Sequence, residues 1–375
     1  MLLTCRKYLV IGIIFVLFLI SGCGGGGKKS TPSGGTPVAV NTVINTGNIS
    51  IAKWFDNATC AVTFSFDDNL ESHYTQSALL LEKYGWRGTF FVNPGYDTSD
   101  YGEYMWGTDM KAGHRALAVK GHEIGNHGWA HEDLTLLSGD KLRSEIENPI
   151  ARLTADIGVR PLSFAHPYNV GFEDNTINNV IFEKHLFSRL ASVHDTQNRI
   201  FIDLLGKEFS GTPPTTLQDL GNGLNDAYNS EKWLILTGHG VVPVTVDGWL
   251  EGEVTTQLLE PFCELIKNKG KVWVGTLAQV GAYEYMKQEV TLGTPAVEVN
   301  NLRVLFNWSD ENRTRFTKCG LNEVFITLIL PALPQQANLN VYLDGNKARY
   351  DVGMGAYIGT VNIIGKDSIV ISATR

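Results

Sequence analysis

The sequence has no excess of positive charge and contains little cysteine. Its 375 residues include 31 Lys and Arg against 39 Asp and Glu, a formal net charge of -8. A chain without a basic excess is not expected to bind nucleic acid. Beyond the N-terminal region the cysteines are Cys60, Cys263 and Cys319, whose spacing matches no thiolate metal cluster. These three can form at most one disulfide.

Long hydrophobic runs are also scarce, except near the N-terminus. Arg6 and Lys7 precede an apolar run, Leu9 to Ile20, which is short for a membrane span and typical of a signal-peptide core. The run ends at Ser21-Gly22-Cys23, which resembles the cleavage box of bacterial lipoproteins. We therefore predict a signal peptide over residues 1–22 and lipidation of Cys23. An ordinary signal peptide and an uncleaved anchor helix are the alternatives.

The predicted lipidation also indicates the cellular location of the protein. Residues 23–37 are rich in Gly, Ser and Pro and would form a flexible tether to the membrane. Position 24 is Gly rather than the Asp that, by resemblance to Gram-negative lipoproteins, favours retention in the inner membrane. The expected location is the bacterial cell envelope, with the outer membrane or cell surface favoured.

The rest of the chain divides into three parts by pattern. Residues 38–59 are an ambiguous lead-in. Residues 60–288 alternate short β-rich runs with helical periodicity, which is typical of a parallel sheet in a (β/α) barrel or an open doubly wound fold. Residues 289–375 contain several short strand-like runs and an Asp344-Gly345-Asn346 hairpin signal, which predict a small all-β, sandwich-like module.

Four polar clusters follow predicted strands of the middle part, where a barrel assembles its active site. Asp67 and Asp68 follow the first strand, and their side chains point in different directions, so one can bind a metal while the other moves protons. His127 and His131 are four residues apart, a spacing that allows both to bind one metal from a helical turn. Each cluster alone has an ordinary explanation: a helix cap for the carboxylates and a chance surface pair for the histidines.

The two remaining clusters would complete a hydrolytic site. In His166-Pro167-Tyr168 the proline fixes a tight turn, so that a backbone N–H can face a cavity. His239 comes just beyond a predicted buried strand, although a core or surface histidine is the usual explanation of such a residue. Two histidines with the Asp68 carboxylate form a metal site with open positions, which suits metal-assisted hydrolysis.

In this order the clusters resemble the motifs of the polysaccharide deacetylase family, carbohydrate esterase family 4, which includes chitin, peptidoglycan and nodulation-factor deacetylases. The resemblance covers roughly residues 60–285, and its motifs lie at Ser65 to Asp68, His127 to His131, Ala165 to Tyr168, His239 and Val272 to Leu277. It implies a distorted (β/α) barrel, a divalent metal that is most often Zn²⁺ (Co²⁺ or Ni²⁺ in some members), and an acetylated polysaccharide or oligosaccharide as substrate.

The resemblance also implies a role for each matched residue. Asp67 would be the general base, His239 the general acid, and the backbone N–H of Tyr168 the oxyanion donor. Asp68, His127 and His131 would bind the metal, and Leu236 and Pro167 would contact the substrate. The expected reaction is removal of N-acetyl groups from a chitin- or peptidoglycan-like polymer of N-acetylglucosamine. An O-acetyl (xylan-type) esterase and a catalytically decayed glycan-binding lipoprotein are the alternatives.

The chain departs from the family pattern at several positions. Gly128 replaces a Ser or Thr, Asn69 replaces a common glycine, and Ala165 stands where many members carry the arginine that orients the base. Thr237 occupies the leucine position of the fifth motif, beside Leu236, and no segment matches the fourth motif. The departures at Ala165 and Gly128, together with the C-terminal β-module, motivate the decayed alternative, and the departures as a whole leave the rate and the substrate open.

Overall fold

The computed structural model describes residues 35–191, 196–204, 215–243, 254–321, 323–334, 336 and 339–375. The predicted signal peptide and the predicted lipidation site Cys23 lie outside these residues. Among the described helices, none has the length and apolar character needed to cross a membrane. Cys60, Cys263 and Cys319 are free thiols.

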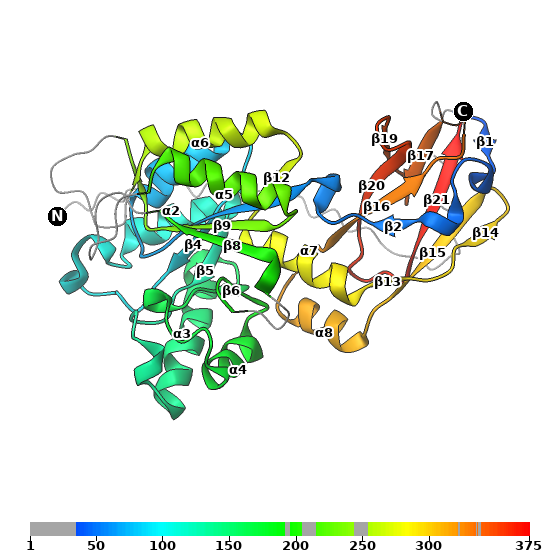
Figure 1. The fold of residues 1–375 in the computed structure, drawn as a ribbon. Coiled ribbons are helices and arrows are strands. Elements are labelled where there is room, and N and C mark those ends of the chain that lie inside the picture. Colours follow the sequence, from blue (N-terminus) through cyan, green and yellow to red (C-terminus); the bar gives the residue numbers. More distant parts are fainter. Residues whose placement is uncertain are drawn as a thin grey trace, which may run out of the picture. The chain divides into compact units, whose positions relative to one another are not determined.

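In the described residues, eight parallel strands form the sheet that carries the polar clusters (Figure 1). Its order is β7-β6-β5-β4-β3-β9-β8, with β12 also paired to β3. Between the two ends of this order, β7 and β8, the described residues show no pairing, so the barrel is open on that side. The strands are β3 (Cys60–Phe66), β4 (Thr89–Val92), β5 (Glu123–Asn126), β6 (Ser163–Phe164), β7 (Phe187–Ser188), β8 (Arg199–Asp203), β9 (Trp233–Gly238) and β12 (Val272–Val274). The expected distorted (β/α) barrel is confirmed.

Helices alternate with these strands, and Figure 1 shows α5 and α6 on one side of the sheet and α3 and α4 on the other. The central strand β3 is buried along its whole length, as expected of a strand covered on both faces. The helices are α1 (Ala78–Lys83), α2 (Thr108–Val119), α3 (Gly139–Ile157), α4 (Asn175–Lys184), α5 (Leu217–Asn229), α6 (Thr256–Lys269) and α7 (Leu277–Glu289). A short parallel pair, β10 (Val241–Val242) and β11 (Val254–Thr255), lies beyond β9.

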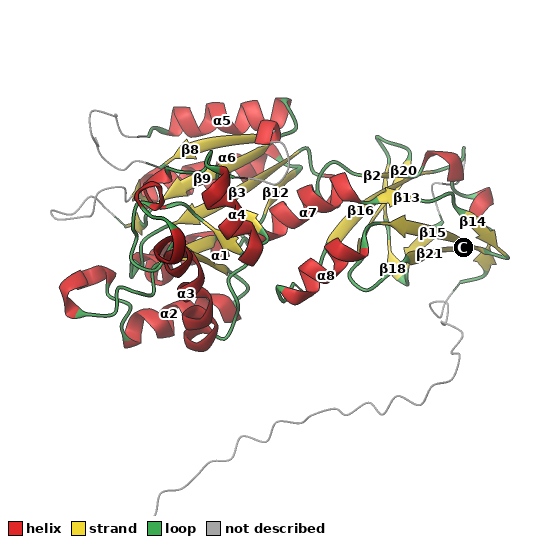
Figure 2. Ribbon diagram, turned by 90° about the horizontal axis from the view of Figure 1, so that it is seen from below, coloured by secondary structure: helices red, strands yellow, loops and turns green. Residues whose placement is uncertain are grey.

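The C-terminal part contains two sheets, visible in Figure 2, whose described pairings are all antiparallel. One has the order β13-β15-β21-β17-β18, with β1 and β14 also attached, and the other has the order β19-β20-β16-β2. Their bounds are β1 (Pro37–Val38), β2 (Ser50–Ile51), β13 (Thr291–Leu292), β14 (Ala296–Glu298), β15 (Asn301–Asn307), β16 (Phe325–Pro331), β17 (Asn340–Leu343), β18 (Asn346–Lys347), β19 (Arg349–Asp351), β20 (Ala356–Asn362) and β21 (Ser368–Thr374). The predicted hairpin is present, because Leu343 pairs with Asn346 across Asp344 and Gly345, both with positive φ.

The structure adds two features to the predicted β-module. A helix, α8 (Asp310–Lys318), lies between β15 and β16, and the Ser309 side chain at its start accepts a hydrogen bond from the Asn312 N–H. The lead-in contributes two strands, because β1 pairs with β21 and β2 pairs with β16. Apolar side chains of the lead-in, among them Val43 and Trp54, are buried in the same core cluster as the C-terminal strands and α7.

Candidate functional site

The predicted site residues come together at the carboxyl ends of neighbouring parallel strands. Asp67 and Asp68 follow β3, His127 follows β5, and His239 follows β9. Because parallel strands present these ends on one edge of the sheet, residues up to 172 positions apart meet in one place. The site therefore results from the topology of the sheet.

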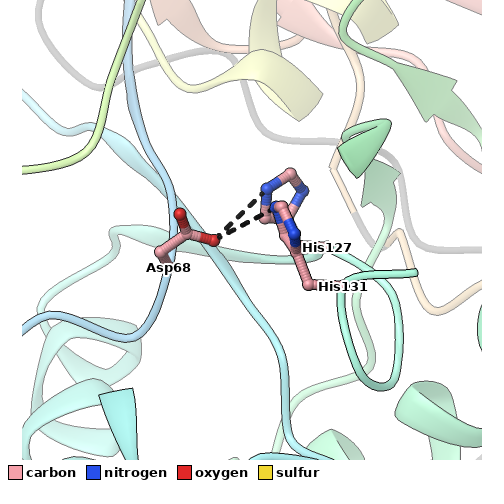
Figure 3. A group of neighbouring side chains, drawn as sticks. All are labelled: Asp68, His127 and His131. Carbon is pink, nitrogen blue, oxygen red and sulfur yellow. Dashed lines mark ion pairs between the residues drawn. The ribbon is translucent and has the colours of Figure 1, made fainter. Parts of the chain in front are cut away.

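Asp68, His127 and His131 form a cluster with the geometry of a metal site (Figure 3). Oδ1 of Asp68 lies 3.5 Å from Nε2 of His127 and 3.5 Å from Nε2 of His131. One candidate ligand atom from each residue lies within 4.8 Å of the others. Oδ1 of Asp68 is buried and has no hydrogen-bond partner in the described structure. A divalent cation would satisfy this oxygen, so the donor set fits the metal that the sequence predicts.

Both histidines turn a ring nitrogen toward Asp68. Nδ1 of His127 lies 3.0 Å from the carbonyl oxygen of Ala165, which can only accept, so the hydrogen on Nδ1 donates there and Nε2 faces Asp68. Burial, and then the neighbouring His127, lower the pKa of His131 to about 4. His131 is therefore neutral at physiological pH, which is the state that a metal ligand requires.

The turn that joins the two histidines differs from the helical turn expected from their spacing. Residues 127–131 are not helical, because Gly128 has a φ of 89° and His131 a φ of 55°. Oε1 of the buried Glu145 accepts hydrogen bonds from the N–H groups of Ala130 (2.8 Å) and Glu132 (3.1 Å), which holds the turn. A Cβ at position 128 would lie 2.6 Å from that oxygen. The positive φ, which is strained for any residue with a Cβ, and this close contact together account for glycine at position 128.

Asp67 forms an ion pair with Arg189, and its Oδ2 also lies 3.6 Å from Nε2 of His127. Nη1 of Arg189 donates to Oδ1 at 2.7 Å and Nη2 donates to Oδ2 at 2.8 Å, and both side chains are almost completely buried. Burial raises the pKa of Asp67, but the charge of Arg189, then His127, and the hydrogen bonds of Arg189 outweigh it. The pKa of this carboxyl is therefore well below its ordinary value. Asp67 is ionised at neutral pH and available to accept a proton.

Arg189 is the functional residue that sequence reasoning missed. The family arginine was expected at position 165, where this chain has alanine, but here the guanidinium comes from the end of β7. The N–H of Arg189 donates to the carbonyl of Phe164 at 3.0 Å, which places it beside the end of β6. Asn169 supports it, since its Oδ1 accepts from Nη2 at 3.0 Å. The available signal was an arginine directly after Phe187-Ser188, a strand of two residues that the sequence pattern did not reveal.

The remaining predicted residues have different surroundings. Nε2 of His239 lies 3.4 Å from Oδ2 of Asp68, and its side chain is 40% exposed, so substrate can reach it. Tyr168 is 64% exposed, and its ring centroid lies 4.4 Å from that of His131. Pro167 is buried at the start of a short 3-10 turn, Pro167–Asn169. Leu236 is fully buried in β9, within the hydrophobic core that also contains Phe64.

Comparison with known proteins shows which proteins this chain resembles. The sequence profile of the family named polysaccharide deacetylase matches residues 56–182. Among curated proteins, the chain is 33% identical to a gellan lyase of Bacillus sp over 129 residues, which is 34% of this chain and 5% of that protein. It is 31% identical to the peptidoglycan-N-acetylmuramic acid deacetylase PdaA of Bacillus subtilis (strain 168) over 88 residues, which is 23% of this chain and 30% of that protein. The chain thus covers only a minor part of these relatives.

Among solved structures, the chain is similar to the chitin deacetylase of the fungal pathogen Colletotrichum lindemuthianum. The sequence identity is 20%, the TM-score is 0.43, and the match covers 60% of this chain and 88% of the other. What these comparisons show is that residues 56–182 are similar to the polysaccharide deacetylase family.

Proposed function

We propose that this protein is a metal-dependent deacetylase that removes N-acetyl groups from a polymer or oligomer containing N-acetylglucosamine. One observation carries the proposal: Asp68, His127 and His131 converge on one point, and the adjacent Asp67 beside them is held by two hydrogen bonds from Arg189. A metal-ligand set and an ionised proton acceptor thus lie side by side. This combination suits hydrolysis of an amide by an activated water.

The proposed roles follow from the charges and hydrogen bonds of the chain. When bound by Asp68, His127 and His131, a divalent metal would act as a Lewis acid on the acetyl carbonyl and make the attacking water acidic enough for a weak base. Asp67 takes the proton of that water, and Arg189 keeps its carboxylate ionised and fixed in orientation. His239, which is exposed at the edge of the site, then donates a proton to the departing amine.

The turn after β6 supplies the other proposed contacts. The backbone N–H of Tyr168 would stabilise the oxyanion that forms on the acetyl carbonyl. Tyr168 has a φ of 56°, a left-handed conformation that a non-glycine residue adopts only when its surroundings impose it. Pro167 precedes it and restricts the turn, and we propose that Pro167 and Leu236 help shape the acetyl pocket.

The structure also bears on the alternative of a decayed site. That alternative was motivated by the missing arginine and the glycine at position 128. Arg189 supplies a guanidinium to Asp67, and Glu145 supplies hydrogen-bond acceptors to the histidine turn. Arg189 thus takes the place of the arginine missing at position 165, and Glu145 supports the turn that contains Gly128. These contacts favour an active enzyme over a protein that only binds glycans. No contact of the described residues favours an O-acetyl substrate.

The substrate prediction can be tested by acetate release. We expect the purified protein loaded with Zn²⁺ to release acetate from N-acetylglucosamine oligomers, and to lose this activity on complete metal removal and regain it with Zn²⁺ or Co²⁺. Acetylated xylan under the same conditions is the comparison. Faster release from xylan would replace the amide substrate by an ester, and activity that survives metal removal would refute the mechanism.

A matched pair of substitutions separates the two neighbouring carboxylates. Asp67→Asn should retain bound metal and lower kcat by at least about 100-fold, because only the proton acceptor is removed. Asp68→Asn should lose both metal and activity, because it removes the charged ligand. Metal content by mass spectrometry, measured beside kcat, distinguishes them. If the two metal contents were exchanged, the assignment of base and ligand would be reversed.

The ion pair predicts a change in pH dependence. Burial is the largest influence on the pKa of Asp67 and raises it, whereas Arg189 lowers it, so Arg189→Met should raise this pKa and move the acidic limb of the activity profile to higher pH. A base works only when deprotonated, so the fractional loss of activity in the variant should be greatest at the acidic end of the profile. The measurement is kcat/KM from about pH 5 to about pH 9.

Arg199 offers the control for this experiment. It forms another buried ion pair, with Nη2 2.8 Å from Oε2 of Glu284. Arg199→Met should destabilise the protein to a similar extent and leave the shape of the pH profile unchanged. If both variants gave the wild-type profile, Arg189 would serve stability alone.

We also propose that the protein is anchored in the bacterial envelope through lipid on Cys23. The support is the sequence pattern: a short apolar run, the Ser21-Gly22-Cys23 box and a Gly-rich segment after it. Several acyl chains on one cysteine would give stable anchoring, whereas one chain binds only marginally. The tether would let the catalytic domain reach a polymer while the anchor stays in the membrane. Gly24 favours the outer membrane or cell surface.

Metabolic labelling tests this location. Wild-type protein should incorporate a labelled fatty acid and sediment with membranes. Cys23→Ser should abolish the label and yield either soluble protein or an unprocessed precursor. Cys5→Ser, inside the predicted signal peptide, is the control and should label normally. Label that persists in Cys23→Ser would refute the anchor.

A further inference from the structure

Two buried histidines that the proposed mechanism does not use lie directly behind the site. His73 and His114 have no exposed surface. Nδ1 of His73 lies 3.1 Å from Nε2 of His114, which belongs to α2. Nε2 of His73 lies 2.9 Å from the carbonyl oxygen of Asp67 and 2.7 Å from that of His239. One imidazole edge thus contacts the backbone of both residues proposed to move protons.

These two carbonyls belong to loops that follow different strands of the sheet. Asp67 follows β3 and His239 follows β9, so a donor shared between their carbonyls fixes the distance between the two loops. The carbonyl of Asp67 also belongs to the peptide that leads into Asp68, which has a φ of 78°. A non-glycine residue in this conformation is strained and needs surrounding contacts to hold it. The His73 contact therefore acts on the metal carboxylate as well as on the base.

The hydrogen on Nε2 of His73 follows from its surroundings, because both neighbouring carbonyl oxygens can only accept. Nδ1 of His114 also faces a carbonyl, that of Met110 at 2.9 Å. If the two imidazole rings together carried three N–H hydrogens and one positive charge, each of these contacts would have both a donor and an acceptor. Burial, and then His114, oppose that charge and lower the pKa of His73 to about 3. Charged or neutral, the pair keeps a hydrogen on Nε2 of His73.

The local backbone supports a special role for this residue. His73 begins a π-helical turn, His73–Ser77, immediately before α1. Such turns cost stability and occur frequently at functional sites. The ring of His73 packs against Phe90, with centroids 5.1 Å apart, and His114 packs against Trp106 at 5.3 Å. These aromatic contacts therefore restrict the positions of the His73 and His114 rings.

We propose that His73, supported by His114, is a positioning residue whose Nε2–H joins the backbone carbonyls of Asp67 and His239 and so sets the geometry of both the proton-transfer residues and the metal carboxylate. The inference rests on the proposed deacetylation for its kinetic consequence. Its consequence for metal binding does not depend on the reaction.

The test compares three variants of the full-length protein. His73→Leu removes the donor at similar volume, whereas His73→Gln retains an N–H group that can reach the same carbonyls. His122→Leu is the control, since His122 is also buried but lies at the start of β5, where its Nδ1 accepts from the Gly88 N–H at 3.0 Å. Each is measured for kcat and KM well below its melting temperature, and for Co²⁺ affinity by visible absorption.

His73→Leu should lower kcat by at least about tenfold with KM changed by less than about twofold, and should weaken Co²⁺ binding. His73→Gln should recover most of both losses. His122→Leu should lower the melting temperature and leave kcat and Co²⁺ affinity unchanged. If His73→Leu behaved like His122→Leu, the role of His73 would be structural only and the proposal would be overturned.

Two further outcomes remain decisive. If the wild-type protein released no acetate from any substrate, the proposed function would fail, and Co²⁺ affinity would still decide the positioning role. If His73→Leu did not fold, nitrogen NMR of histidine-labelled wild-type protein would decide, with the His73 signals assigned by their absence from His73→Gln. A protonated Nε2 is required, and an unprotonated Nε2 overturns the proposal.

Discussion

The ion pair between Asp67 and Arg189 is the interaction on which the arrangement of the site depends. Two adjacent carboxylates at the end of a buried strand would repel each other, and desolvation would favour protonation of at least one. Arg189 neutralises Asp67 through two hydrogen bonds and keeps it ionised. The charge of Asp68 then remains for a cation to balance. A single strand end can supply both a metal ligand and a proton acceptor because different partners balance the two charges.

Several residues of the candidate site have a strained backbone conformation. Asp68, Asn69, His131 and Tyr168 all have positive φ, a conformation of order 1–3 kcal/mol above the common regions for each such residue. Buried polar side chains offset this strain. Asn69, where the family often has glycine, is one of them: its Nδ2 donates to the carbonyl of Asn93 and its Oδ1 accepts from the Asn93 N–H, both at 2.8 Å. Asparagine tolerates the left-handed region and adds hydrogen bonds that glycine lacks.

The sequence predicted the parts of this site that are encoded locally. Asp67, Asp68 and His239 each follow a recognisable hydrophobic strand, His127 follows the short segment Glu123–Asn126, and a parallel sheet brings such strand ends together. Arg189 follows a strand of two residues, which is too short to produce a hydrophobic pattern. The conformation of the histidine turn depends on Glu145, which lies 14 residues beyond His131 on α3, so spacing alone suggested a helix where none exists. The pairing of β1 and β2 with C-terminal strands is equally non-local.

The same ion pair bears on whether the site still works. A buried pair of charges contributes little to stability, because desolvation offsets much of the attraction, and apolar replacements of similar volume are often neutral or stabilising. Removing only one partner, in contrast, costs about 3–5 kcal/mol because the other charge is left buried alone. In a protein without catalytic activity, replacing both charged groups together would therefore leave the free energy of unfolding unchanged or raise it. This chain retains both Asp67 and Arg189. Asn169 accepts a hydrogen bond from the guanidinium of Arg189, and the adjacent Asp68 has a buried oxygen, Oδ1, without a hydrogen-bond partner in the described structure. The proton transfer proposed for Asp67 would account for that combination, whereas stability alone does not.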